Sequence, residues 1–144
     1  MVYIDTSVLL VYTLTQALEK RRFTATTWLF NKIAAGSLAA ATSFYPLHEL
    51  YVFGLDNGPD FTTGAAFGKE ALKKVLALPL QIFPLISRTE RRLHERRLTE
   101  LRDASDLPHA VTALMYRCEA IVAYDHHFKA IAHVIPYKTP EDYL

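Results

Sequence analysis

The chain lacks the residues and runs that mark secreted or membrane proteins. Its single cysteine, Cys118, excludes an intrachain disulfide and offers no cysteine cluster for a metal. No apolar run approaches the roughly 18 residues that a membrane-spanning helix needs. No secretory signal is recognisable, because Asp5 interrupts the N-terminal apolar segment and no basic segment precedes it. These absences predict a soluble, cytoplasmic protein with no membrane partner.

Several function classes lack their sequence signals as well. There is no glycine-rich phosphate loop, no dinucleotide fingerprint and no Ser-His-Asp arrangement. The formal net charge of +1 does not favour nucleic-acid binding, although a local basic patch would be enough for it. The chain also has no repeats and no low-complexity stretch. With 144 residues, of which 51% are hydrophobic, it is predicted to form one domain over residues 1–144.

Short apolar runs alternate with helical patterns along the chain. We expect strands at residues 2–4, 38–42, 80–83, 120–123 and 132–135. We expect helices at residues 8–12, 18–35, 43–54, 69–78, 87–102 and 105–118, with caps from Thr6 or Ser7, Ser43, Ser87 and Ser105. Residues 56–68 contain Asn57-Gly58-Pro59 and predict a loop or broken helix. The alternation predicts an α/β fold, a three-layer α/β/α sandwich around a parallel sheet of about five strands.

Four acids lie where this sheet would keep an active site. Asp5, Glu49, Asp106 and Asp125 each follow a predicted strand or begin the next helix. The helix after Asp106 runs back across the sheet, and residues 120–123 return the chain to the same edge, so Asp106 and Asp125 meet there. Taken singly, Asp106 is better explained as a helix-start residue and Asp5 as a loop residue. Together, four acids from three strand-helix units predict a site for Mg²⁺ or Mn²⁺ that acts on phosphates.

Four stretches resemble a PIN-domain ribonuclease, of the kind found as toxins in VapBC toxin–antitoxin pairs. The stretches are residues 2–10, 42–52, 106–113 and 123–128, and their order and spacing agree over essentially the whole chain. The resemblance implies a metal-dependent endoribonuclease whose acidic site is Asp5, Glu49, Asp106 and Asp125, with Ser7 as an accessory group. It also implies an RNA substrate, a cognate antitoxin and a homodimer.

One position departs from the family pattern and keeps other functions open. Ala123 stands where the family often has threonine or serine, which removes a hydroxyl that could orient Asp125 or a water. A catalytically silent PIN-like binding module and a housekeeping RNA- or DNA-processing nuclease are the alternatives. A receiver-like phosphoacceptor domain would need a lysine after a late strand, and Tyr137-Lys138 fits poorly.

The segment before Asp106 is strongly charged. Between residues 88 and 102 lie six arginines and three glutamates, a local excess of +3. A solvated helix face explains most of them; a phosphate-contacting ridge is the functional reading, and its candidate residues are Arg91, Arg92, Arg96 and Arg102. His109 shares a helix face with Asp106 and is an accessory candidate. His126 and His127 are expected to be exposed, with RNA contact as the alternative.

Overall fold

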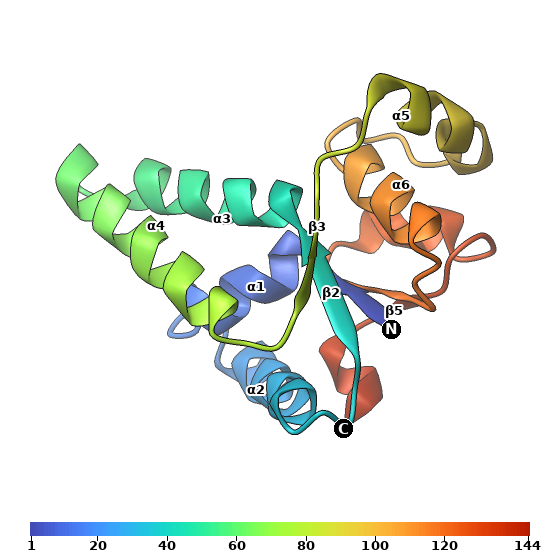
Figure 1. Ribbon diagram of the computed structural model, residues 1–144. Helices are drawn as coiled ribbons and strands as arrows, with labels where there is room; N and C mark the ends of the chain where they lie inside the picture. Colours follow the sequence, from blue (N-terminus) through green and yellow to red (C-terminus); the bar gives the residue numbers. More distant parts are fainter.

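The computed structural model describes residues 1–144 and contains one five-stranded sheet (Figure 1). Its strands are β1 (Val2–Ile4), β2 (Ala40–Ser43), β3 (Gln81–Phe83), β4 (Ile121–Val122) and β5 (Tyr137–Lys138). All neighbours pair in parallel, in the order β3-β2-β1-β4-β5. The chain builds outward from β1 to β3 and then crosses to β4 on the other side. A topological switch point therefore lies between the carboxyl ends of β1 and β4, where open α/β sheets bind ligands.

Helices cover both faces of the sheet and make the three-layer α/β/α sandwich that the sequence predicts. In Figure 1, α1, α2 and α4 lie on one side of the sheet, and α5 and α6 lie on the other. The α-helices are α1 (Thr6–Thr13), α2 (Lys20–Ala34), α3 (Phe44–Asn57), α4 (Phe61–Leu76), α5 (Arg88–Glu95) and α6 (Leu107–Met115). The 3-10 helices are η1 (Arg96–Leu98), η2 (His126–Ile131) and η3 (Pro140–Tyr143). None of the helices has the length and apolarity that crossing a bilayer requires.

The central strand β1 contributes to a separate core on each face of the sheet. Val2 and Ile4 are fully buried in a cluster that includes Leu29 of α2. Tyr3 points to the opposite face and joins a second cluster with Val111 of α6. Side chains alternate in this way because successive residues of a strand face opposite sides. Burial on both faces explains why the strand sequences are continuously apolar.

Of the two predictions for residues 56–68, a loop or a broken helix, the structure shows the broken helix. Helix α3 continues to Asn57 and α4 begins at Phe61, so the segment is a helical hairpin with a short connection. Glycines allow its two helices to touch backbone to backbone: a Cβ built on Gly54 would lie 2.6 Å from the backbone nitrogen of Gly68. A Cβ on Gly64 would lie 2.8 Å from the carbonyl oxygen of Leu55. The glycines that suggested a loop are therefore required by close helix packing.

The fifth strand lies later than predicted. Residues 132–135 form turns after η2, and β5 is Tyr137–Lys138, which pairs with β4. Ile131 and Ile135 are buried because they pack the helical turn onto the second core, which gave this segment its apolar appearance. Helix α5 also ends at Glu95, earlier than the predicted position 102. The predicted capping box is confirmed, since Ser87 and Glu90 exchange side-chain to backbone hydrogen bonds.

Two predicted caps are wrong and a third is confirmed. Asp5, rather than Thr6 or Ser7, is the N-cap of α1. Helix α6 has Asp106 at its N-cap with no side-chain cap, because the Ser105 hydroxyl instead donates to Asp103 Oδ1 at 2.7 Å. Ser43 caps α3 as predicted. Both errors place an acid, in place of a hydroxyl residue, at the start of a helix on the carboxyl edge of the sheet.

Candidate acidic site at the switch point of the sheet

Asp5 directly follows β1, and Ser7 links it by hydrogen bonds to the segment that follows β4. Its Oδ2 accepts hydrogen bonds from the Ser7 backbone nitrogen at 3.0 Å and from Ser7 Oγ at 2.6 Å. Ser7 Oγ also accepts a bond from the backbone nitrogen of Tyr124, at 2.9 Å, just beyond β4. The Ser7 hydroxyl therefore joins the two strand ends that form the switch point. The side chain of Ala123 is fully buried, and Ser7 supplies a hydroxyl beside it.

Glu49 reaches the same edge from α3. Thr6 Oγ1 donates to its Oε2 at 2.7 Å, and its Oε1 lies 2.7 Å from Nε2 of His109. His109 is only 2% exposed, and its Nδ1 lies 3.7 Å from Asp5 Oδ1. The imidazole therefore sits between two of the predicted acids. The accessory role of His109 stays a prediction.

Asp106 and Asp125 meet around another histidine. His127 Nδ1 lies 3.0 Å from Asp106 Oδ2 and 3.2 Å from Asp125 Oδ1. The same nitrogen lies 3.8 Å from Asp103 Oδ2. Ligand atoms of Asp103, Asp106 and His127 all lie within 4.8 Å of one another, close enough to hold one metal ion.

Sequence reasoning missed Asp103 and His127 as members of this group. A turn places Asp103, because the backbone nitrogen of Asp106 donates to the Asp103 carbonyl at 3.2 Å. The three-residue spacing of the two acids was the available signal for Asp103. His127 gave no such signal, because its position depends on η2 folding back after β4.

Burial and mutual repulsion perturb the pKa values of the acids. Burial, followed by the negative charge of Asp125, raises the pKa of Asp106 from 3.8 to about 6, against a lowering hydrogen bond from His127. Burial also raises the pKa of Asp5, although His109 and Ser7 oppose the rise. These pKa shifts are those of carboxylates that are less solvated than surface acids and that lie near other negative charges.

The pKa of Glu49 changes in the opposite direction. Burial raises it, but the hydrogen bond and charge of His109, together with Thr6, outweigh burial and lower the pKa. The pKa of His109 is raised: burial alone would lower it, and the hydrogen bond to Glu49 and the charge of Asp5 outweigh burial. The pKa of His127 is raised by its bond to Asp106 and by Asp125. Each histidine is thus coupled to a pair of acids.

The donor set fits a hard divalent cation. Carboxylate oxygens dominate it, and Mg²⁺ and Mn²⁺ prefer such oxygens while tolerating one imidazole. Burial first, and then the charge of Asp125, raise the pKa of Asp106, and a cation bound beside it would favour its ionised form. Asp103, Asp106 and His127 have the spacing for one ion, and Asp125 lies beside them. Asp5 and Glu49 stay predicted ligands.

The predicted RNA-contacting arginines lie beside this group or on the adjoining α5–η1 segment. Arg102 lines a polar hollow of about 960 Å³ together with Asp103 and His127. Arg92 and Arg96 line a smaller hollow of about 280 Å³. Arg91 is partly buried, 3.7 Å from Glu95. Three of the four arginines are therefore exposed on hollows that a substrate could enter.

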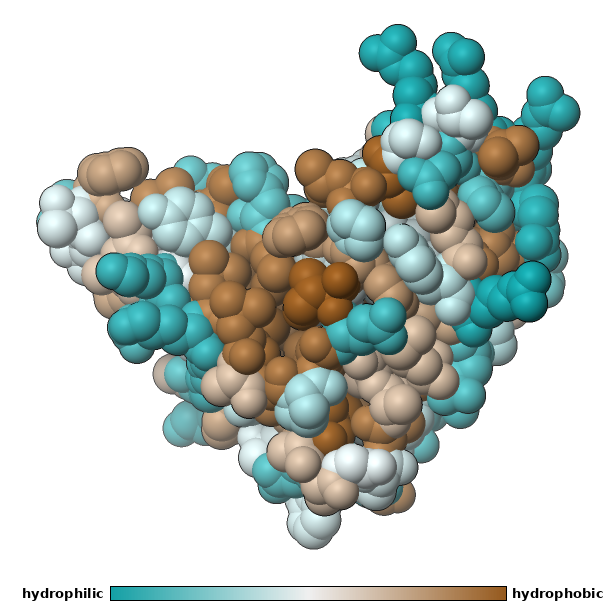
Figure 2. Space-filling model, in the orientation of Figure 1, coloured by the Kyte–Doolittle hydropathy of each residue, from teal (hydrophilic) through white to brown (hydrophobic).

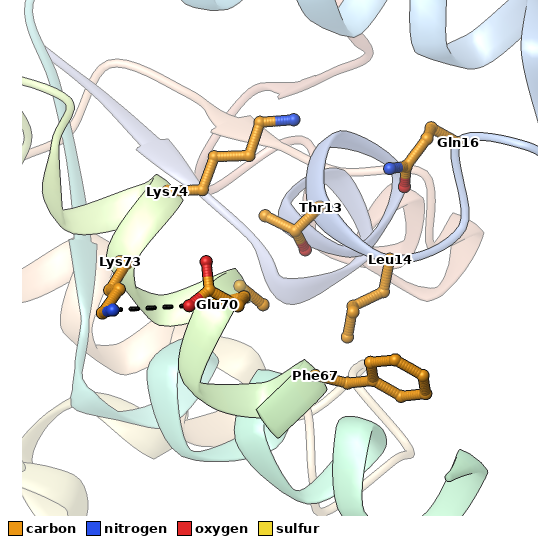
Figure 3. Close-up of a pocket in the computed structure, with 8 residues that line it drawn as sticks. Thr13, Leu14, Gln16, Phe67, Glu70, Lys73 and Lys74 are labelled. Atoms are coloured by element: carbon orange, nitrogen blue, oxygen red, sulfur yellow. Dashed lines mark hydrogen bonds and ion pairs between the residues drawn. The ribbon is translucent and has the colours of Figure 1, made fainter. Parts of the chain in front are cut away.

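Two further hollows lie away from the acids. Figure 3 shows one at the C-terminal end of α1, where Thr13, Leu14 and Gln16 face α4; its volume is about 510 Å³. Figure 2 shows apolar side chains gathered over β3 and the adjoining part of α4. An apolar groove of about 700 Å³ in this region is lined by Phe44, Tyr45, Leu47, His48, Tyr51, Leu72, Leu76 and Leu85. Neither hollow contains a carboxylate of the acidic site.

Comparison with known proteins supports the fold. No protein-family model matches the sequence, and no curated protein matches it. Among solved structures, a chain from the crystal structure of VapBC2 from Rickettsia felis, bound to a DNA fragment from their promoter, is similar with a TM-score of 0.66. The match covers 96% of this chain and 98% of that chain at 16% sequence identity. At this identity the likeness establishes the architecture, and the chain has the PIN-like α/β/α fold that its sequence motifs predicted.

Proposed function

We propose that the chain is a single-domain, metal-dependent endoribonuclease that hydrolyses RNA phosphodiester bonds and serves as the toxin of a toxin–antitoxin pair. The observation that carries this proposal is the gathering of two pairs of acids, Asp5 with Glu49 and Asp106 with Asp125, near enough that the charge of Asp5 acts on Asp106. Two histidines, His109 and His127, hold these acids in two pairs. Such a concentration of acids is unfavourable unless a cation joins it.

Mg²⁺ or Mn²⁺ bound there would lower the pKa of a water and neutralise charge on the phosphodiester. Neighbouring side chains orient the carboxylates by hydrogen bonds. Ser7 orients Asp5 through its hydroxyl, and Thr6 and His109 each hold one oxygen of Glu49. Asp106, with a pKa of about 6, is mainly ionised at neutral pH and so available to bind a cation.

RNA is the expected substrate because a basic surface adjoins the acids. Arg102 lines the same hollow as Asp103 and His127, and Arg92 and Arg96 lie on the neighbouring segment. Arginine side chains there would neutralise phosphates on either side of the scissile bond. Their loss is expected to weaken RNA binding while the acidic site remains intact.

Protein partners are part of the proposal. The similar solved structure is a VapBC2 complex, and we infer that this chain likewise binds an antitoxin that holds it inactive. We also infer that it forms a homodimer. The apolar groove between α3 and α4, with Phe44 and Leu85 more than half exposed, supports a protein contact on that face.

The test is cleavage of a mixed RNA pool by wild type and Asp5→Asn, each with Mn²⁺, Mg²⁺ or chelator. Asp60→Asn is the matched control, since Asp60 is an exposed helix cap whose carboxylate accepts hydrogen bonds from Thr63, and asparagine also caps well. Wild type and Asp60→Asn are expected to cleave only with metal, and Asp5→Asn not at all.

Cleavage that persists in chelator would contradict the mechanism. Absence of cleavage by folded wild type, together with calorimetry that shows no metal binding, would favour the silent binding module. A metal-dependent nuclease that is harmless when expressed in cells, with no neighbouring antitoxin-like reading frame, would favour the housekeeping role.

A further inference from the structure

A chain of buried polar side chains runs from the middle of the sheet to Glu49. Tyr3 in β1 is fully buried, and its hydroxyl lies 2.7 Å from Ser43 Oγ and 3.2 Å from His109 Nδ1. His109 Nε2 lies 2.7 Å from Glu49 Oε1. The four side chains come from β1, β2, α6 and α3, and they form a continuous set of hydrogen bonds.

Burying these polar groups in an otherwise apolar core costs free energy. Tyr3 belongs to a cluster of aliphatic and aromatic side chains, and Ser43 is also fully buried. Phenylalanine and alanine at these two positions would fill nearly the same space without polar groups to satisfy. A hydrogen bond adds only about 1 kcal/mol net to stability. The polar chain is therefore better explained by the group held at its outer end than by stability alone.

Every hydroxyl and ring nitrogen in this series finds a partner if each group donates its proton to the next one toward Glu49. The Tyr45 backbone nitrogen donates to Ser43 Oγ at 3.3 Å, which leaves the Ser43 hydroxyl proton for Tyr3. When the His109 ring is neutral, Tyr3 donates its hydroxyl proton to Nδ1, which lies 3.2 Å away. With Nδ1 as the acceptor, the ring proton of His109 lies on Nε2 and is donated to Glu49. Tyr3 in this arrangement fixes both the tautomer and the orientation of the ring.

We propose that Tyr3 and Ser43 are positioning residues that act through His109 to fix the carboxylate of Glu49 for the metal-dependent reaction. Thr6 donates a hydrogen bond to the other carboxylate oxygen, so the carboxylate group of Glu49 is held in one orientation. Each oxygen keeps a second lone pair for a water or a cation. The catalytic purpose of this chain rests on the proposed function, whereas the orientation of His109 by Tyr3 does not.

The test variant is Tyr3→Phe, which keeps the ring and deletes the hydroxyl. Thr42→Val is the matched control: Thr42 is fully buried in β2, and its hydroxyl donates to the Ile4 carbonyl at 2.9 Å, without contact to His109. Three quantities are measured on each protein: the His109 ring N–H signal by NMR without metal, the midpoint of thermal unfolding, and Mn²⁺ affinity by calorimetry.

Tyr3→Phe is expected to lose the slowly exchanging ring N–H signal of His109 and to weaken Mn²⁺ binding about tenfold, as changes behind a metal ligand commonly do. In the RNA assay it lowers kcat and leaves KM unchanged. Thr42→Val is expected to lower the unfolding midpoint by a similar amount while keeping the ring signal and the Mn²⁺ affinity. If Tyr3→Phe fails to fold, Ser43→Ala removes the far end of the chain and is expected to broaden the same ring signal.

The proposal is overturned if Tyr3→Phe keeps the wild-type ring signal and Mn²⁺ affinity, or if Thr42→Val loses both to the same extent. A wild-type protein that neither binds Mn²⁺ nor cleaves RNA would overturn the proposed function instead. In that case the ring signal, recorded without metal, still decides whether Tyr3 orients His109.

Discussion

Replacing Asp106 by asparagine is expected to stabilise the metal-free protein near neutral pH. Burial and then the charge of Asp125 raise the pKa of Asp106 from 3.8 to about 6 in the folded protein. A carboxyl group whose pKa is higher in the folded than in the unfolded state binds its proton more tightly when folded. Its contribution to stability is therefore full at the lowest pH, below the unfolded pKa, and is lost as the pH rises through the folded pKa.

The size of the effect follows from the shift. A rise of about two pKa units corresponds to roughly 3 kcal/mol, and screening by solvent near the carboxylate reduces this to about 1.5 kcal/mol. Asparagine stays neutral at every pH, so Asp106→Asn avoids the unfavourable ionised form. At pH 7.5 the variant is expected to exceed wild type by about 1.5 kcal/mol in free energy of unfolding, and the gap narrows toward pH 4.

Urea unfolding in chelator at pH 4.5 and pH 7.5 measures this difference. Asp56→Asn is the control, because it makes the same chemical change at an exposed carboxylate near the end of α3 and is expected to shift the midpoint little at either pH. A variant at position 106 that is less stable than wild type at pH 7.5, or a difference independent of pH, would refute the reasoning. With Mn²⁺ present the order is expected to reverse, since only wild type gains from binding the ion.

Three other perturbations have definite expected results. Gly54→Ala is expected to lower the free energy of unfolding by about 1–3 kcal/mol in a denaturant titration, because its methyl would lie 2.6 Å from the Gly68 nitrogen; an unchanged midpoint would contradict that contact. Ser7→Ala leaves the Tyr124 amide without its acceptor, so we expect a loss of about 1–3 kcal/mol and slower RNA cleavage. Mn²⁺ at one hundred times its Kd is expected to stabilise wild type by about 2.7 kcal/mol in thermal unfolding, with no shift for Asp5→Asn.

The sequence predicted the sheet and the edge at which the acids meet because both depend on local pattern. Strands β1 to β4 follow from short apolar runs between helices, and once the sheet is parallel, Asp5 and Asp125 must emerge at one edge. Glu49 and Asp106 follow from their positions in the first turns after a strand or at a helix start. The three-residue spacing of His109 to Asp106 placed it near the acids, but its partners Glu49, Asp5 and Tyr3 come from other elements.

The remaining features depend on long-range packing. Gly58 and Pro59 are ordinary loop signals, and only the backbone contact between α3 and α4 shows that the flanking glycines belong to helices. The apolar residues near Ile135 resemble a strand until they are seen to pack helical turns onto the core. The position of His127 beside Asp106 depends on the fold of η2, and no local pattern encodes it.

The glycine contact between α3 and α4 has a consequence for recognising related chains. Gly54 in α3 and its C-cap Gly58 are four residues apart, as are Gly64 and Gly68 in α4, and no side chain at these positions separates the two helices. Packing requires these glycines and chemistry does not, whereas the reverse holds for the acids. A descendant that lost catalysis would keep the glycine repeats and be free to replace Asp106. The two sets of positions would then diverge at different rates, and a comparison of both would separate inheritance of the architecture from inheritance of the activity.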